Sequence, residues 1–66
     1  MKVTIEIETK KLTNNTLFQV TDECTKQGVI TKDVETILVW EGMKLHKLRF
    51  VWGIEGKITG LCKKEI

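Results

Sequence analysis

The chain contains no serine, alanine, proline or tyrosine, and only one histidine and two cysteines among its 66 residues. Without serine, the hydroxyl nucleophile of Ser-His-Asp enzymes is missing. Cys24 and Cys62 do not form the closely spaced pairs of structural zinc sites, and only His46 remains as a further ligand. We therefore expect no metal site, no cofactor and no enzymatic activity.

Long apolar runs and glycine motifs are also missing. No apolar segment approaches the roughly eighteen residues that span a bilayer. Met1 and Lys2 lead directly into strand-like sequence, without the apolar core of a signal peptide. The five glycines fit neither a P-loop nor a dinucleotide-binding pattern. These absences predict a cytoplasmic protein with no membrane partner.

The composition is that of a small globular domain. Hydrophobic residues make up 41% and charged residues 30%, and eleven Lys/Arg against nine Asp/Glu give a net charge of +2. Nine Thr, seven Ile and six Val make one third of the chain β-branched, which favours sheet. The length allows a single domain, residues 1–66. Missing Ala and Pro with many Lys, Ile and Asn are typical of low-GC genes of phages and mobile elements.

The first strand and the following segment are marked by different patterns. Lys2–Thr9 alternates strictly between apolar and polar residues, which predicts a half-buried strand. Residues 13–27 fit a helix with Thr13 as its N-cap and Gly28 at its C-terminal end. The threonine-rich stretch within it suits a strand equally well. The helix is the preferred interpretation and the strand its alternative.

The rest of the chain predicts strands joined by glycine-containing turns. Strands are expected at Val34–Trp40, Met43–Trp52 and Lys57–Lys63, with turns at Glu41-Gly42 and Glu55-Gly56. A helix over residues 32–41 is the alternative for the first of these strands.

A two-residue turn in the second hairpin would place Phe50 opposite Leu61 and Trp52 opposite Thr59. It would also place Ile58 and Cys62 on the face opposite Phe50. In a regular strand Met43 and Leu45 would face one side of the sheet, whereas Leu48, Phe50 and Trp52 would face the other. This change of side predicts a bulge near His46-Lys47.

These elements predict an α+β fold. An N-terminal strand and a C-terminal β-meander form an antiparallel sheet with one helix, and a small all-β barrel is the alternative. In a cytoplasmic protein Cys24 and Cys62 are expected as two buried free thiols, with a disulfide as the alternative. His46, between basic neighbours, is expected as an exposed or stacked side chain rather than a general base.

The function expected from this pattern is protein binding. So small a sheet has more apolar surface than one helix can cover, so a second copy or a host protein is expected to cover the rest. The expected contact residues are Trp40, Met43, Leu45 and Trp52, because buried aromatic side chains dominate interface energies. Such a protein would be an accessory factor of a phage or mobile element that docks on a host protein, or an oligomer that sequesters a small-molecule ligand.

Nucleic-acid binding is the alternative function. Small β-sheet proteins bind nucleic acid through cations for the phosphates and aromatic rings for the bases. The residues that would do so are Lys44, His46, Lys47, Arg49 and Trp52. A pI of about 8.6 is below that of most basic nucleic-acid-binding domains, so the charge signal is weak.

Overall fold

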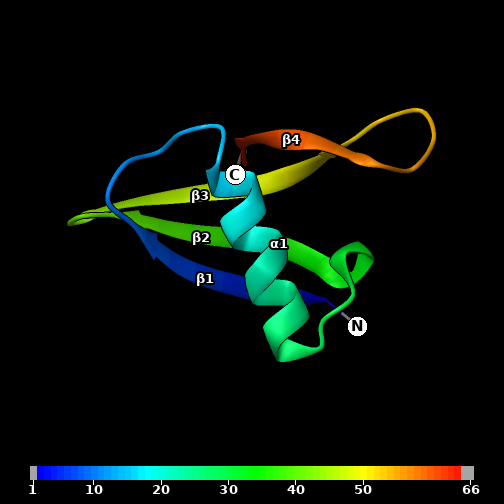
Figure 1. Ribbon diagram of the computed structural model, residues 1–66, viewed down its shortest axis with the longest axis horizontal. Helices are drawn as coiled ribbons and strands as arrows, with labels where there is room; N and C mark the ends of the chain where they lie inside the picture. Colours follow the sequence, from blue (N-terminus) through cyan, green and yellow to red (C-terminus); the bar gives the residue numbers. More distant parts are fainter. Residues whose placement is uncertain (1, 65–66) are drawn as a thin grey trace.

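The computed structural model describes residues 2–64 and contains one α-helix and one four-stranded sheet. The elements are β1 (Val3–Thr9), α1 (Thr16–Gln27), the short 3-10 helix η1 (Thr31–Asp33), β2 (Val34–Glu41), β3 (Lys44–Trp52) and β4 (Ile58–Lys63) (Figure 1). The strand order is β1-β2-β3-β4. The expected α+β fold is confirmed, and because the sheet is not closed the barrel alternative has no support.

The sheet is mixed rather than fully antiparallel. β2, β3 and β4 form the expected antiparallel meander, whereas β1 pairs with β2 in parallel. The reason is the connection: α1 carries the chain back along the sheet, so β2 starts at the same end as β1. The pattern of residues 2–9 predicts a strand but carries no information on the direction of its partner.

The helix at the preferred position is confirmed, with a later start than expected. It begins at Thr16, and Thr13 instead organises the preceding turn: its hydroxyl accepts the Asn15 N–H at 3.1 Å and its carbonyl accepts the Thr16 N–H at 3.1 Å. Gly28 ends the helix at φ 68°, a left-handed conformation that glycine adopts without steric cost. The alternative helix over residues 32–41 is wrong, because β2 occupies 34–41.

One face of the sheet carries the core. Figure 1 shows α1 crossing in front of the strands, from the β3–β4 side to the β1 side. We call the face beneath α1 the inner face and the opposite one the outer face. The buried apolar side chains come from α1 and from the inner-face positions of three strands: Ile5, Ile7, Val20, Cys24, Ile37, Val39 and Phe50. In residues 2–64, no helix or strand packs on the outer face.

The two hairpins differ from the predicted turns. Gly42 has φ 61° and forms the first turn with Met43, one residue later than expected. In the second hairpin Phe50 pairs with Leu61 as predicted, but the register shifts between Val51 and Trp52, so Trp52 pairs with Ile58 and not with Thr59. The shift turns Ile58 to the inner face, where it packs against the core.

The bulge predicted near His46-Lys47 is absent. β2 and β3 pair without a shift from Glu41 opposite Lys44 to Ile37 opposite Leu48. The two parities in β3 arise because both faces of the strand carry apolar side chains. Leu45 lies on the outer face, and Leu48 lies on the inner face next to the core.

Both cysteines are free, and they lie on different faces of the sheet. Cys24 belongs to α1 and is buried between the helix and the inner face. Its burial is the main cause that raises the pKa of its thiol, and the nearby Glu23 carboxylate is the second. Cys62 is half-buried, and because its neighbour Leu61 packs on the core, Cys62 faces outward. The predicted free thiols are confirmed, but only Cys24 is fully buried.

The packing of the inner face leads to a stability prediction at Ile37, which is completely buried. Ile37→Val removes one methylene from the core, so we expect the free energy of unfolding to fall by about 0.5–1.5 kcal/mol. Ile54→Val is the matched control, because Ile54 is fully exposed and its change should stay within about 0.5 kcal/mol. Urea unfolding of both variants checks this, and equal effects at the two sites would contradict the described core.

Candidate protein-binding surface

The outer face of the sheet combines apolar and charged side chains. On β2 and β3 the outward positions carry four apolar side chains: Leu38, Trp40, Leu45 and Val51. Glu6 and Glu8 of β1 flank Leu38 and Trp40, whereas Lys47 and Arg49 lie on β3 itself, between Leu45 and Val51. Apolar residues bordered by charge on an uncovered face are typical of contact surfaces.

Trp40 lies on the outer face close to the β2–β3 turn, and a hydrogen bond orients its ring. Its indole Nε1–H donates to the Glu6 carboxylate at 2.5 Å, and Leu45 is its partner across the β2–β3 pair. Leu38 lies two residues before it on the same face. The hydrogen bond satisfies the only polar group of the indole, so the ring can be covered by a partner without leaving an unpaired donor.

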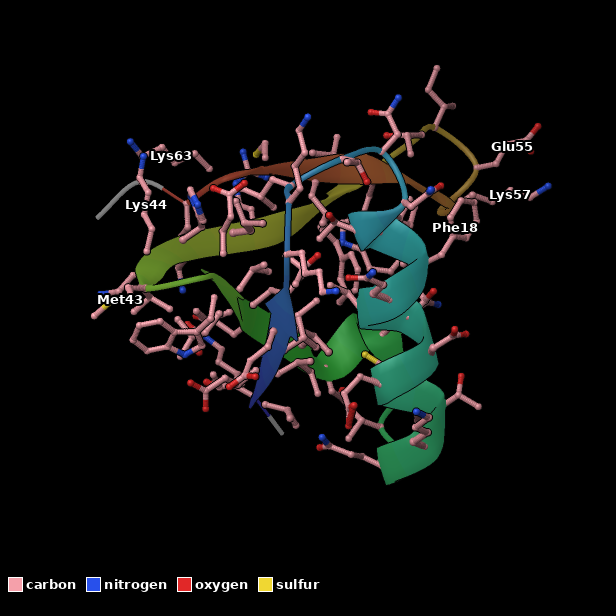
Figure 2. All side chains as sticks on the ribbon, turned by 60° about the vertical axis from the view of Figure 1, so that its left-hand side comes forward. Phe18, Met43, Lys44, Glu55, Lys57 and Lys63 are labelled. Carbon is pink, nitrogen blue, oxygen red and sulfur yellow. The ribbon has the colours of Figure 1, made fainter. Side chains whose placement is uncertain are left out.

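The structure brings together three of the four residues expected to bind protein. Trp40 and Leu45 form a cross-strand pair, and Met43 lies beside them at the β2–β3 turn with its side chain 99% exposed (Figure 2). Trp52 is separate: it lies on the inner face at the far end of β3, where its ring meets Phe50 edge-on at 6.0 Å. The register shift beside Trp52 could not be predicted from the sequence.

The residues expected to bind nucleic acid are divided between the two faces. Lys47 and Arg49 point outward, whereas Lys44 and His46 have the inward parity of β3. Trp52 lies at the opposite end of the strand from Lys44. The five side chains therefore do not form one surface.

His46 belongs to a hydrogen-bonded cluster rather than to a free basic patch. Its Nε2 lies 3.2 Å from Oε1 of Glu41, and the other carboxylate oxygen of Glu41 accepts the Leu12 N–H at 2.9 Å. Glu41 thus ties the loop before α1 to the end of the β2–β3 hairpin. The pKa of the Glu41 carboxyl lies below its ordinary value. The hydrogen bond from the Leu12 N–H is the main cause, and the hydrogen bond with His46 is the second.

Lysines gather at one corner of the sheet, where β3 begins and β4 ends. Figure 2 shows Lys44 and Lys63 together at this corner. With Lys47 and Lys64 they border a shallow cavity of about 440 Å³. Lys64 crosses the outer side of β3, because its Nζ donates to the Thr36 hydroxyl of β2. This basic corner is the nearest approach to a cation cluster in residues 2–64.

Carboxylates gather at the opposite edge, where β1 meets α1. A shallow cavity of about 630 Å³ there is lined by Glu6, Glu8, Asp22 and Glu23, with Trp40 at its side. In the described part of the chain, no three His, Cys, Asp or Glu side chains are placed to hold a metal ion. No helix of residues 2–64 has the length and apolar character needed to cross a membrane.

Sequence reasoning missed the two outward glutamates of β1 and Lys64. Glu6 and Glu8 looked like an ordinary solvated strand face, and Lys64 looked like part of a tail. Their positions follow from the strand order, since only the pairing of β1 with β2 brings Glu6 near Trp40. The strict alternation of apolar and polar residues in β1 was the available signal in the sequence, but it does not indicate which strand lies beside β1.

Comparison of the chain with protein-family models, with curated proteins and with solved structures finds no match.

The lowered pKa of Glu41 predicts a pH-dependent contribution to stability. A carboxyl whose pKa falls on folding stabilises the protein above its ordinary pKa, and this contribution is lost as the pH drops through the folded value. We expect wild type to be more stable than Glu41→Gln near neutral pH, and this difference to shrink as the pH falls from about 5 to about 3. Urea unfolding across this range measures it.

Glu55→Gln is the control, because Glu55 and its partner Lys57 are both largely exposed at the tip of the second hairpin. Its stability difference from wild type should be small at every pH. A constant difference between wild type and Glu41→Gln across the range would contradict the role given to Glu41.

Proposed function

We propose that this is a non-catalytic binding protein that contacts another protein through the outer face of its sheet. The observation that supports this is the position of the Trp40 indole. Glu6 orients it, Leu45 pairs with it and Leu38 lies near it, on a face that α1 does not cover. Aromatic side chains surrounded by apolar neighbours contribute most of the binding energy in protein interfaces.

The exposed surface supports the same proposal. The accessible area is 5143 Å², roughly a fifth more than the 4,300 Å² or so that the scaling law gives for a monomer of this mass. Among the exposed large apolar side chains, Leu45 at 39% exposure lies on the outer face and Met43 lies at the adjacent turn, whereas Phe18, Ile30, Trp52 and Ile54 lie elsewhere. Covering the outer face would remove apolar area from water, which favours association.

Leu45→Lys tests the proposed function, because it puts a charge beside Trp40 without touching the inner-face core. We expect it to weaken binding through the outer face at least tenfold, which is about 1.4 kcal/mol. Two measurements read this out: native mass by light scattering over a range of protein concentrations, and retention of lysate proteins on the immobilised chain.

Ile54→Lys is the matched control, since Ile54 is a fully exposed apolar residue at the tip of the second hairpin. It should leave both measurements unchanged. The proposal is wrong if two results occur together. Wild type is monomeric at every concentration, and every lysate protein that it retains is also retained by the Leu45→Lys variant. Circular dichroism of both variants confirms that they fold.

Nucleic-acid binding through the basic corner is the second candidate function. It is favoured by the gathering of Lys44, Lys47, Lys63 and Lys64 around one cavity. We expect any binding of single-stranded DNA or RNA to fall steeply with salt, and Lys44→Gln/Lys63→Gln to weaken it and flatten the salt dependence by about two counterions. Lys26→Gln/Lys32→Gln, at exposed positions in α1 and η1, is the control, and no binding at low salt would eliminate this function.

A further inference from the structure

β1 is an outer strand of the sheet, and within residues 2–64 no strand pairs with its far edge. Figure 1 shows β1 at the border of the sheet, with the C-terminal end of α1 reaching past it. The strand has 7 residues and pairs with β2 without a shift from Thr4 to Thr9. A long, regular edge strand is a template on which another chain can pair.

The backbone groups on this edge belong to alternate residues. Successive residues of a strand point their N–H and C=O groups to opposite sides. The Thr9 carbonyl accepts the Gly42 N–H at 3.4 Å, so residues with the parity of Thr9 point theirs to β2. The groups of Thr4, Glu6 and Glu8 therefore point away from the sheet. In residues 2–64 no turn or loop supplies a backbone partner for them.

The opposite edge of the sheet is less suited to strand addition. The pairing of β3 with β4 shifts between Val51 and Trp52, and the loop before α1 lies next to Leu61, with which it lines a cavity of about 300 Å³. Irregular pairing and a covering loop are two ways in which proteins protect sheet edges. The pairing of β1 is regular over Thr4–Thr9, which makes β1 the better edge for an added strand.

Carboxylates line the β1 edge from two sides. The cavity of about 630 Å³ at this edge is lined from the outer-face side and from α1 by four acids: Glu6, Glu8, Asp22 and Glu23. Lys26 is the only cation among the lining residues that the structure describes. A chain added at this edge is therefore attracted if it carries positive charge.

These carboxylates are available to a partner. Glu8 and Asp22 are exposed, and neither forms an ion pair within residues 2–64. Glu6 uses one carboxylate oxygen for the Trp40 indole and keeps the other. Because like charges repel across a strand pair, the same acids disfavour a second β1 edge and favour a basic strand.

We propose that the β1 edge binds an extended basic segment of another protein, which adds a fifth strand antiparallel to β1. This site goes beyond the proposed function and does not depend on it, because β2 separates the β1 edge from Leu45. Backbone hydrogen bonds supply the affinity of such an added strand, and alternate side chains supply its specificity.

The backbone pattern of β1 defines the sequence that the segment needs. In an antiparallel pair, an outward-pointing residue exchanges both hydrogen bonds with the residue directly opposite. The residues opposite Glu6 and Glu8 therefore bond to β1, and their side chains lie on the outer face, about 5 Å away between Cβ atoms. Lys or Arg fits these two positions. The residue between them lies on the inner side next to Ile7, where an apolar β-branched side chain fits.

A synthetic peptide tests the proposed pairing. The probe has seven residues of alternating lysine and valine, blocked ends and a dye, and its binding is measured by fluorescence anisotropy at low salt. We expect a Kd below about 1 mM. N-methylation of the two central lysine amides removes two backbone donors but no charge, so it should weaken binding at least about tenfold. N-methylation of the first two valine amides, which point away from β1, should leave binding nearly unchanged.

Substitutions in the protein test the position of the site. Glu8→Lys turns one attractive pair into a repulsive one, so it should weaken binding of the peptide at least about threefold. Glu55→Lys is the matched control, because it changes the net charge equally at the exposed tip of the second hairpin (Figure 2). It should bind as wild type does. Leu45→Lys should also bind as wild type does, which separates this site from the proposed function.

The remaining outcomes overturn the proposal. Without binding of the unmodified peptide up to about 1 mM, the β1 edge is not a site for a basic strand. Equal binding of both methylated peptides would show charge attraction without strand pairing. Loss of binding through the valine amides alone would overturn the antiparallel direction. Equal weakening by Glu8→Lys and Glu55→Lys would show an effect of net charge. A dimer of the chain alone that the peptide dissociates would place a second copy on this edge instead.

Discussion

The structure depends on one constraint: a sheet has two faces, and the single α-helix of residues 2–64 covers only one. The helix buries Val20 and Cys24 against Ile5, Ile37 and their neighbours, and this packing is the core of the molecule. Everything on the other face must either tolerate water or be covered from outside the chain. The uncovered outer face follows from this constraint, and so does its role as the proposed binding surface.

Elements that depend on local pattern could be predicted from the sequence. The alternation of residues 2–9, the glycine at 28 and the β-branched stretch 34–40 each gave the correct element. Trp40 and Leu45 were expected on the contact surface, but their cross-strand pairing depends on a turn one residue later than predicted. Features that depend on distant pairing could not be predicted. They are the parallel β1–β2 pair, the register shift beside Trp52 and the position of Lys64 across β3. Tertiary contacts decide them, and no short stretch of the sequence indicates those contacts.

Two glutamates show why residue type alone underestimates a site. In the sequence Glu6 is a polar residue of an alternating strand and Glu41 belongs to a predicted turn, yet each fixes a group from a distant segment. Glu6 orients the Trp40 indole on the outer face, and Glu41 joins Leu12 to His46 beside the first turn. The only histidine is thereby engaged in a structural contact, so the basic surface depends on lysine and arginine. Charged side chains of this sheet therefore fix distant groups as well as face solvent.

The helical connection between β1 and β2 also bears on how the molecule assembles. The β2–β3 and β3–β4 pairs join residues close in sequence, so the meander closes short loops, whereas β1 must find β2 across the whole of α1. From these loop lengths we expect that the meander forms early in folding and that β1 docks late. Until β1 is in place, the β2 edge is open and Glu6 does not restrain Trp40, so the late strand completes both the sheet and its contact surface.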